Sequence, residues 1–198
     1  SACLVGSEMC IRDSVKEDAP GVFARIREQI KEGRWEAEGA MWLEPDCNIS
    51  SGESLIRHII YGRRFFEQEL GAEKNEVLWL PDVFGYSAAL PQILQKSGIP
   101  YFMTTKIGWN EFNRFPHDTF LWKGIDGTEV LTHLISTRNY QKPGDLKMVG
   151  NHSTTYNGLQ NASQLMGTWQ RYQDKDVSTE VLTCYGSVSY THLRAHET

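Results

Sequence analysis

Residues 77–87 read VLWLPDVFGYS, and the rest of the chain is best understood from this stretch. Its first four residues are bulky and apolar, a run too short for a helix and typical of a strand buried on both faces. Pro81 lacks an N–H and would end the strand, so Asp82 would lie just past its C-terminal end. In parallel α/β proteins, ligands bind at this edge of the sheet. Asp82 is therefore the first catalytic candidate, although capping of the turn would also explain it.

Length and composition are those of one globular domain or of a piece of a larger one. The chain has 198 residues, of which 40% are apolar, and a net charge of −5. Its basic residues form no stripe, which argues against a nucleic-acid partner. It has no apolar run of 18 residues, which argues against a membrane span. The aromatic content of 11% suits either sugar-stacking surfaces or ordinary core packing.

The cysteine spacing and the two ends of the chain bear on location and on domain limits. The four cysteines have neither metal-ligand spacing nor the spacing of a disulfide framework, and no signal peptide is visible, so we expect a cytoplasmic protein. Residues 1–14 and 187–198 resemble translated sequencing adapter, although genuine flexible ends would explain them too. We expect the first of these to be neither helix nor strand, and the native part to span 15–186.

Two strand exits resemble each other. Residues 42–46 read WLEPD and residues 79–82 read WLPD, so that each apolar segment is followed by a proline and an acid. The long amphipathic helix predicted between them would begin at a capping box of Ser50 and Glu53 and would end at Gly71. This pattern indicates one βαβ unit with its carboxylates at the same edge of the sheet.

The remaining elements are predicted from hydrophobic periodicity and from the positions of glycine and proline. We expect helices from Asp18 to Gly33, from Ser87 to Gly98 and from Asn161 to Tyr172, and strands at 40–43, 101–103, 119–123, 130–134 and 180–183. In the last of these helices, Leu165, Met166, Trp169 and Tyr172 form the apolar side. Residues 135–158 are polar and long enough for an active-site loop.

Three motifs coincide along the chain: residues 33–48, 51–54 and 79–94. Together they resemble the N-terminal catalytic domain of the alpha-mannosidases of glycoside hydrolase family 38, in its bacterial branch. Residues 115–120 and 124–128 continue the match. The resemblance implies an α/β fold, part of an irregular parallel β/α barrel of the glycoside hydrolase/deacetylase-like type, which this chain would contain truncated at both ends.

The resemblance also implies a chemistry. Family members act on terminal alpha-mannosides by a retaining mechanism assisted by zinc. The resemblance assigns to Asp82 the roles of nucleophile and zinc ligand. A retaining glycosidase needs an ionised carboxylate for attack at the anomeric carbon and a protonated one about 5 Å away. A nearby Zn²⁺ would favour the ionised form of Asp82.

Six further residues are predicted to bind the substrate: Trp42, Glu44, Asp46, Tyr86, Lys106 and Trp109. Lys106 aligns with a basic residue close to the nucleophile in the family and would hold Asp82 ionised. Simpler interpretations stay open, because Asp46 would also serve as a helix cap, Lys106 as a solvated strand end, and Tyr86 and Trp109 as core residues.

The chain departs from the family pattern at the other metal ligands and at the general acid. No His-x-His or His-x-Asp pair precedes Asp82, and we interpret His58 and His133 as structural. The Gly-Asp-Gly-Gly segment that carries the general acid should follow Gly186, where the adapter-like end begins. We therefore expect a fragment that is inactive alone, from an enzyme that takes an oligosaccharide or glycoside and could be a homo-oligomer.

Three other interpretations remain open. Asp46 and Asp82 would suffice as an acid and nucleophile pair without a metal. Alternatively, the chain is a non-catalytic carbohydrate-binding fragment in which tryptophans stack on sugars. In the last interpretation it is an incomplete domain without activity of its own.

Overall fold

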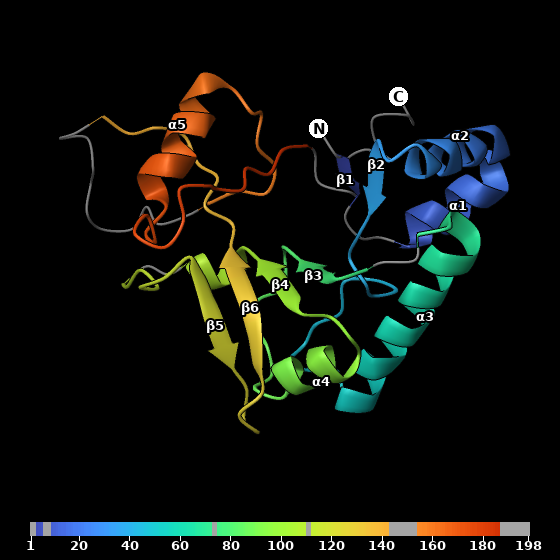
Figure 1. Ribbon diagram of the computed structural model, residues 1–198, viewed down its shortest axis with the longest axis horizontal. Coiled ribbons are helices and arrows are strands. Elements are labelled where there is room, and N and C mark those ends of the chain that lie inside the picture. Colours follow the sequence, from blue (N-terminus) through green and yellow to red (C-terminus); the bar gives the residue numbers. More distant parts are fainter. Residues whose placement is uncertain (1–2, 6–8, 73–74, 110–111, 143–153, 187–198) are drawn as a thin grey trace. The chain divides into compact units, whose positions relative to one another are not determined.

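The computed structural model describes residues 3–5, 9–72, 75–109, 112–142 and 154–186 (Figure 1). The elements are β1 (Cys3–Val5), α1 (Met9–Asp18), α2 (Pro20–Lys31), β2 (Trp35–Ala37), α3 (Gly52–Leu70), β3 (Val77–Leu80), α4 (Leu90–Lys96), β4 (Tyr101–Thr104), the 3-10 helix η1 (Lys106–Gly108), β5 (Thr119–Lys123), β6 (Glu129–Leu134) and α5 (Ala162–Arg171). They form two compact units, unit 1 with Ser1–Met103 and Leu121–Leu131, and unit 2 with Thr104–Phe120 and Thr132–Thr198.

The N-terminal part contains more regular structure than the sequence predicted. The expectation of neither helix nor strand before residue 15 is wrong, because β1 pairs in parallel with β2 and α1 begins at Met9. Asp18 is the last residue of α1 and not the cap of the next helix. Ala19 is the N-cap of α2 instead, and Pro20 occupies its first turn.

Helix α3 ends as predicted but starts one residue later. Ser51 is its N-cap, with a hydroxyl that accepts a hydrogen bond from the N–H of Ser54 at 3.2 Å, so the predicted capping box one residue earlier is wrong. Glu53 pairs instead with Arg57. Gly71 ends the helix at a φ of 70°, a value that favours glycine. No helix in the described ranges has both the length and the apolar character that a membrane span requires.

Residues 40–43 do not form the predicted strand. The backbone turns at Ala40, which has a φ of 60°. The buried side chain of Asn75 holds this turn, because its Oδ1 accepts from the N–H of Ala40 and its Nδ2 donates to the carbonyl of Ala37, both at 2.9 Å. A side chain distant in the sequence therefore overrides the local preference of an apolar run for a strand.

The two similar segments, 42–46 and 79–82, nevertheless lie in neighbouring stretches of backbone, as predicted. Isolated parallel bridges join Gly39 to Leu78 and Cys47 to Tyr86. Between these two points the segment 39–47 runs beside β3 and the turn that follows it. The parallel pairing predicted for a βαβ unit is thus confined to two bridges and does not extend into a ladder.

Strand β3 occupies its predicted bounds, but its burial alternates. Leu78 and Leu80 are buried in the main core of unit 1, whereas Val77 and Trp79 are half-buried. The strand is therefore fully covered on one face only, and not on both as predicted. Its core face packs with α4, whose Leu90 belongs to the same cluster.

Helix α4 begins later than predicted. Ser87 lies in the preceding turn, where its hydroxyl accepts from the N–H of Ala89 at 3.2 Å, and the helix starts at Leu90. Pro91 falls in the first turn, where a proline is tolerated. Gly98 follows the C-cap with a φ of 71°.

The larger sheet is mixed. Its strand order is β3-β4-β6-β5. The N–H of Leu131 donates to the carbonyl of Pro100 and the N–H of Ile135 to that of Thr104, so the partners advance together and β4 and β6 are parallel. β5 and β6, which match the strands predicted at 119–123 and 130–134, form a hairpin. The described strands thus give a mixed α/β structure, which does not demonstrate the predicted parallel barrel.

Helix α5 buries its polar side, contrary to prediction. Three of the residues predicted to form its apolar side are at least 40% exposed, namely Leu165, Met166 and Trp169. The buried helix residues are instead Gln164, Gly167, Thr168 and Arg171. The strand predicted at 180–183 is also absent, since this stretch has no regular structure. Much of the predicted loop at 135–158 and the whole tail at 187–198 lie outside the described residues.

Replacing Gly62 by alanine should destabilise unit 1. Gly62 is buried in α3, and a Cβ there would lie 2.5 Å from the carbonyl oxygen of Ala40 and 2.7 Å from the nitrogen of Trp42. We expect a loss of about 1–3 kcal/mol in urea unfolding, because backbone must move to make room. Gly21→Ala is the matched control in α2, where nothing lies within 4 Å, and should stabilise by up to about 1 kcal/mol. Equal effects of the two changes would contradict the close approach.

Glu38 should make unit 1 less stable as the pH rises. Burial, and then repulsion from Glu36 and Glu76, raise the pKa of Glu38 from 4.5 to about 7, although the N–H of Val77 donates to its carboxylate. The contribution of Glu38 to the free energy of unfolding is full below pH 4.5 and is lost as the pH rises through about 7. This is a change of roughly 2–3 kcal/mol.

Glu38→Gln removes this titration. Its free energy of unfolding, relative to that of the unmodified chain, should rise between pH 4 and pH 8. Glu67→Gln is the control, because Glu67 is exposed on α3 and its variant should show no such rise. A pH-independent difference for Glu38→Gln would refute the assignment.

Candidate functional site

Asp82 lies where the sequence predicted it, directly after β3. Pro81 is buried and ends the strand, and Asp82 itself is half-buried, so its residue keeps access to solvent. The N–H of Asp82 donates to Oε1 of Glu44 at 2.7 Å. This bond brings together two of the predicted site residues from segments that are 38 positions apart.

The turn after Asp82 is fixed by close packing against the neighbouring segment. Gly85 has a φ of 157°, and a Cβ at this position would lie 2.4 Å from Nδ2 of Asn48. The adjacent bridge between Cys47 and Tyr86 holds the same two segments side by side. The backbone conformation therefore favours glycine here, and a larger residue would also have to displace the side chain of Asn48.

Asp46 is exposed and is used by its own turn. Its Oδ1 accepts hydrogen bonds from the N–H groups of Asn48, at 2.8 Å, and Ile49, at 3.2 Å. This geometry agrees with the simpler interpretation of Asp46 as a capping residue.

Tyr86 occupies a core position. Its ring packs edge-to-face with Phe102, at 4.8 Å between centroids, and with Trp122 at 6.3 Å. Its hydroxyl lies within hydrogen-bonding distance of the carbonyl oxygens of Leu80 (2.9 Å) and Val83 (3.2 Å). These contacts tie the strand to its exit turn, so the structural interpretation of Tyr86 accounts for the side chain.

Trp42 faces α3. Its ring contacts Tyr61 and Phe65 edge-to-face, at 6.5 and 6.0 Å. With Ser54, Arg57, His58 and Tyr61 it lines a pocket of about 330 Å³. That lining includes none of the carboxylates near Asp82, so the structure assigns Trp42 to a separate pocket of unit 1. Burial lowers the pKa of His58, which favours its neutral form.

Lys106 and Trp109 are brought together in unit 2. The ammonium group of Lys106 lies 3.5 Å from the centroid of the Trp109 ring and 5.8 Å from that of Tyr156, in a cation–π arrangement. The indole N–H of Trp109 donates to the carbonyl of Thr154 at 3.0 Å. Lys106 is therefore more than a solvated strand end.

No pattern in the sequence indicated the buried ionic cluster in unit 2. Asp118 is 1% exposed and pairs with Nη1 of Arg171 at 3.0 Å and with Arg114 at 3.3 Å. Burial, and then the charge of Arg171, lower the pKa of Arg114 to about 10. Because α5 buries Arg171, a search for an apolar stripe on this helix could not find the cluster.

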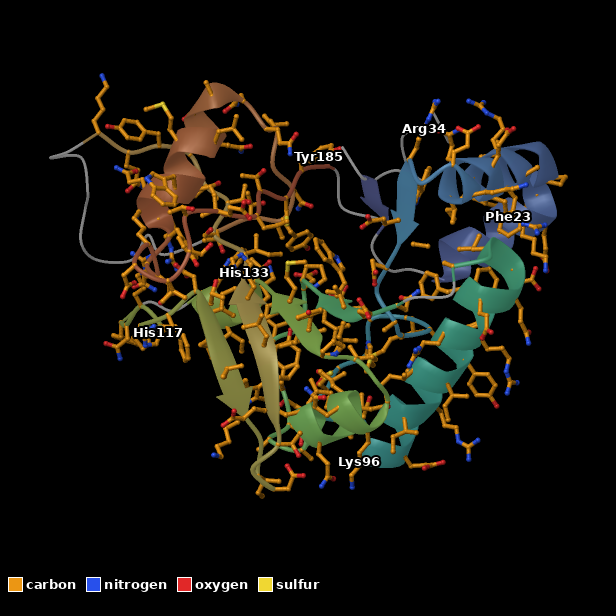
Figure 2. The ribbon with its side chains drawn as sticks, viewed as in Figure 1. Phe23, Arg34, Lys96, His117, His133 and Tyr185 are labelled. Carbon is orange, nitrogen blue, oxygen red and sulfur yellow. The ribbon has the colours of Figure 1, made fainter. Side chains whose placement is uncertain are left out.

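Asp174 extends this cluster. It accepts hydrogen bonds from the N–H groups of Asp118 and Thr119, at 2.7 and 2.8 Å, and lies 2.7 Å from Nδ1 of His117. Burial alone would raise the pKa of Asp174, but these hydrogen bonds outweigh it and lower the pKa. Figure 2 shows His117 and His133 at the end of the β5–β6 hairpin opposite its turn.

His133 agrees with its predicted structural role. Its Nδ1 lies 2.9 Å from the hydroxyl of Thr119, which also contacts the hydroxyl of Tyr172 at 3.0 Å. Burial lowers the pKa of His133. Across the described residues, no group of three or more His, Cys, Asp or Glu side chains is placed to hold a metal ion.

Residues 7–195 match the glycosyl hydrolases family 38 N-terminal domain. The chain belongs to this family. The family 38 chain is 43% identical over 151 residues to alpha-mannosidase G of Dictyostelium discoideum, covering 76% of this chain and 14% of the relative. It is 46% identical over 125 residues to an alpha-mannosidase of Saccharomyces cerevisiae, covering 63% of this chain and 11% of the relative. It thus spans only about a seventh or less of these relatives.

Solved structures show the same fold for the family 38 chain. An alpha-mannosidase from Enterococcus faecalis V583 superposes with a TM-score of 0.57 at 15% identity, over 99% of this chain and 24% of that one. A second family 38 protein from Enterococcus faecalis gives a TM-score of 0.54 at 17% identity, over 97% and 22%. At these identities the likeness concerns the fold alone.

Removing the carboxylate of Glu44 should destabilise the exit of β3. Glu44→Ala leaves the N–H of Asp82 without this acceptor, and we expect a loss of about 1–3 kcal/mol in urea unfolding. Glu44→Gln keeps an oxygen at the same place and should cost less than about 1 kcal/mol. If the two variants unfold alike, the hydrogen bond does not stabilise the site.

Proposed function

We propose that this chain is part of an alpha-mannosidase that hydrolyses terminal alpha-mannosides, with Asp82 as the nucleophile. The observation that carries the proposal is the placement of Asp82, solvent-accessible after a buried strand and with its backbone held by Glu44, in a chain of family 38. The named relatives are alpha-mannosidases, which supports the same substrate class for this chain.

The chemistry required of Asp82 is attack on an anomeric carbon. One oxygen of an ionised carboxylate forms a bond to that carbon while the bond to the leaving oxygen breaks, and a second acid protonates the leaving group. A glycosyl ester on Asp82 results, and water then hydrolyses it with retention. The hydrogen bond from Asp82 to Glu44 uses the backbone N–H and orients the residue.

The finer parts of the proposal come from the family resemblance. We propose that the strands belong to an irregular parallel β/α barrel in the longer protein, and that the protein is cytoplasmic. We also propose a zinc ion bound by Asp82. The described residues alone do not supply a metal site, so the other ligands would have to come from elsewhere in the protein.

Asp82→Asn should lower kcat/KM on an aryl alpha-mannoside by several orders of magnitude, because an amide cannot attack. The assay needs a protein with the complete family domain. Asp46→Asn is the matched control, since Asp46 only accepts turn hydrogen bonds through Oδ1, and should remain close to normal. A fluorinated mannosyl donor should label the peptide that contains Asp82. Equal losses in both variants would favour a pair of Asp46 and Asp82 instead.

Zinc content offers an independent test of the metal proposal. In the same longer protein, metal analysis should find about one zinc ion per chain, and markedly less in Asp82→Ala. Full activity after exhaustive chelation, or unchanged zinc in the variant, would refute a role of Asp82 as a ligand.

Non-catalytic sugar binding is the second candidate function. The pocket beside α3, with Trp42 and Tyr61 in its lining, is the observation that favours it. Binding of mannose that Trp42→Ala abolishes and Asp82→Ala leaves unchanged would support this alternative.

A further inference from the structure

Helix α5 turns its apolar side toward solvent. Leu165, Met166 and Trp169 are 49%, 56% and 40% exposed. Positions three and four apart lie on one face of a helix, so these three side chains form a continuous apolar surface, called here the α5 stripe. The residues that the helix buries lie on its opposite face, namely Gln164, Gly167, Thr168 and Arg171. An amphipathic helix packed in this reversed sense leaves apolar surface in water unless something else covers it.

Close packing on the polar side keeps α5 from rotating to bury the stripe. Gly167 lies so near the segment 138–140 that a Cβ on it would be 2.5 Å from the nitrogen of Tyr140. Nη1 of Arg171 pairs with Asp118 at 3.0 Å, and the two side chains are 3% and 1% exposed. Rotation of the helix would take Arg171 away from a buried carboxylate, which costs more than the burial of a few apolar side chains would return.

Two glutamines hold the helix at further points. Nε2 of Gln170 donates to the carbonyl of Gln141 at 2.7 Å, and its Oε1 accepts from the N–H of the same residue at 3.0 Å. Oε1 of Gln164 accepts from the N–H of Gln160 at 3.1 Å. The orientation of α5 is therefore fixed along the helix, and the exposure of the α5 stripe follows from that orientation.

The size of the stripe favours a segment of the same polypeptide over a second copy of the chain as its partner. Three partly exposed side chains offer on the order of 300 Å² of surface, whereas each partner in a stable complex contributes about 800 Å². A tethered segment does not lose the translational freedom that two separate molecules lose on association. A small apolar contact is therefore sufficient within one polypeptide but not between two.

The family relatives contain the additional polypeptide that such a contact requires. This chain spans only a small part of the matched alpha-mannosidases and of the superposed solved structure. Most of each relative thus lies outside the stretch that corresponds to this chain.

We propose that the α5 stripe is an internal interface of the longer family 38 protein. Its partner is a segment of the same polypeptide outside residues 1–198, which covers Leu165, Met166 and Trp169 with aliphatic or aromatic side chains. The inference rests on the packing of α5 and on membership of the family, and it does not depend on the role of Asp82.

Oxidation by hydrogen peroxide tests the proposal in a protein with the complete family domain. Met166 should be oxidised at least about tenfold more slowly in the native protein than after unfolding in urea, because a covered thioether is not accessible to the oxidant. Met41, which is 2% exposed, is the internal reference for a buried methionine. Peptide mass spectrometry measures both rates. Oxidation of Met166 in the native protein at the rate of the unfolded protein would overturn the proposal.

Dilution separates a covering segment from a second copy. The protection of Met166 should stay the same when the longer protein is diluted about a hundredfold, because a contact within one polypeptide does not depend on concentration. Protection that disappears on dilution would assign the α5 stripe to an interface between copies and would refute the internal contact.

Substitution of Met166 gives a second, independent measurement on the longer protein. Met166→Glu should lower its melting temperature by about 3 °C or more, because a carboxylate would be forced into an apolar contact. Met166→Leu is the matched control, since it keeps an apolar side chain of similar volume and should change the melting temperature by less than about 1 °C. A melting temperature that Met166→Glu leaves unchanged would show that the stripe stays in water and would contradict the proposal.

Discussion

The hydrogen bond from the N–H of Asp82 to Glu44 is the contact on which the candidate site depends. It joins the end of β3 to a segment that has no ladder of its own to hold it. That segment is positioned by two bridges, by the side chain of Asn75 and by the missing Cβ of Gly62. The geometry around Asp82 is therefore set by the packing of an irregular segment. A change that moves residues 39–47 would also move Glu44, and with it the hydrogen bond that holds the backbone of Asp82.

The sequence predicted those elements whose pattern is local. The body and end of α3, the bounds of β3 and the β5–β6 hairpin all follow from periodicity and glycine positions, and all are present. Residues 40–43 show the limit of this reasoning. Met41 is buried as an apolar residue should be, but Asn75, more than thirty positions away, turns the backbone at Ala40. A long-range hydrogen bond of this kind leaves no trace in a local pattern.

The candidate site was predictable in position but not in orientation. Asp82 could be placed because a short apolar run and a proline fix where a strand ends. Trp42 and Tyr86 could not be assigned, because the direction of each ring depends on partners such as Tyr61 and Phe102 from other elements. The same limit applies to α5. The helix itself was predicted correctly, but its buried side includes Arg171. Asp118 neutralises this arginine, and the pairing is a tertiary contact that a local pattern does not reveal.

Two carboxylates show how the chain shifts the pKa of an acid. Glu38 is partly buried, and desolvation dominates, so its pKa rises to about 7. Asp174 is more deeply buried, yet its pKa falls, because two backbone N–H groups and His117 stabilise the charged form. Donors to its oxygens can therefore keep a buried carboxylate ionised. Asp82 differs from both in its position, because it follows Pro81 at the end of the strand, is half-exposed, and is held through its backbone N–H by Glu44. The position just beyond β3 thus combines a backbone that is held in place with a residue that keeps access to solvent.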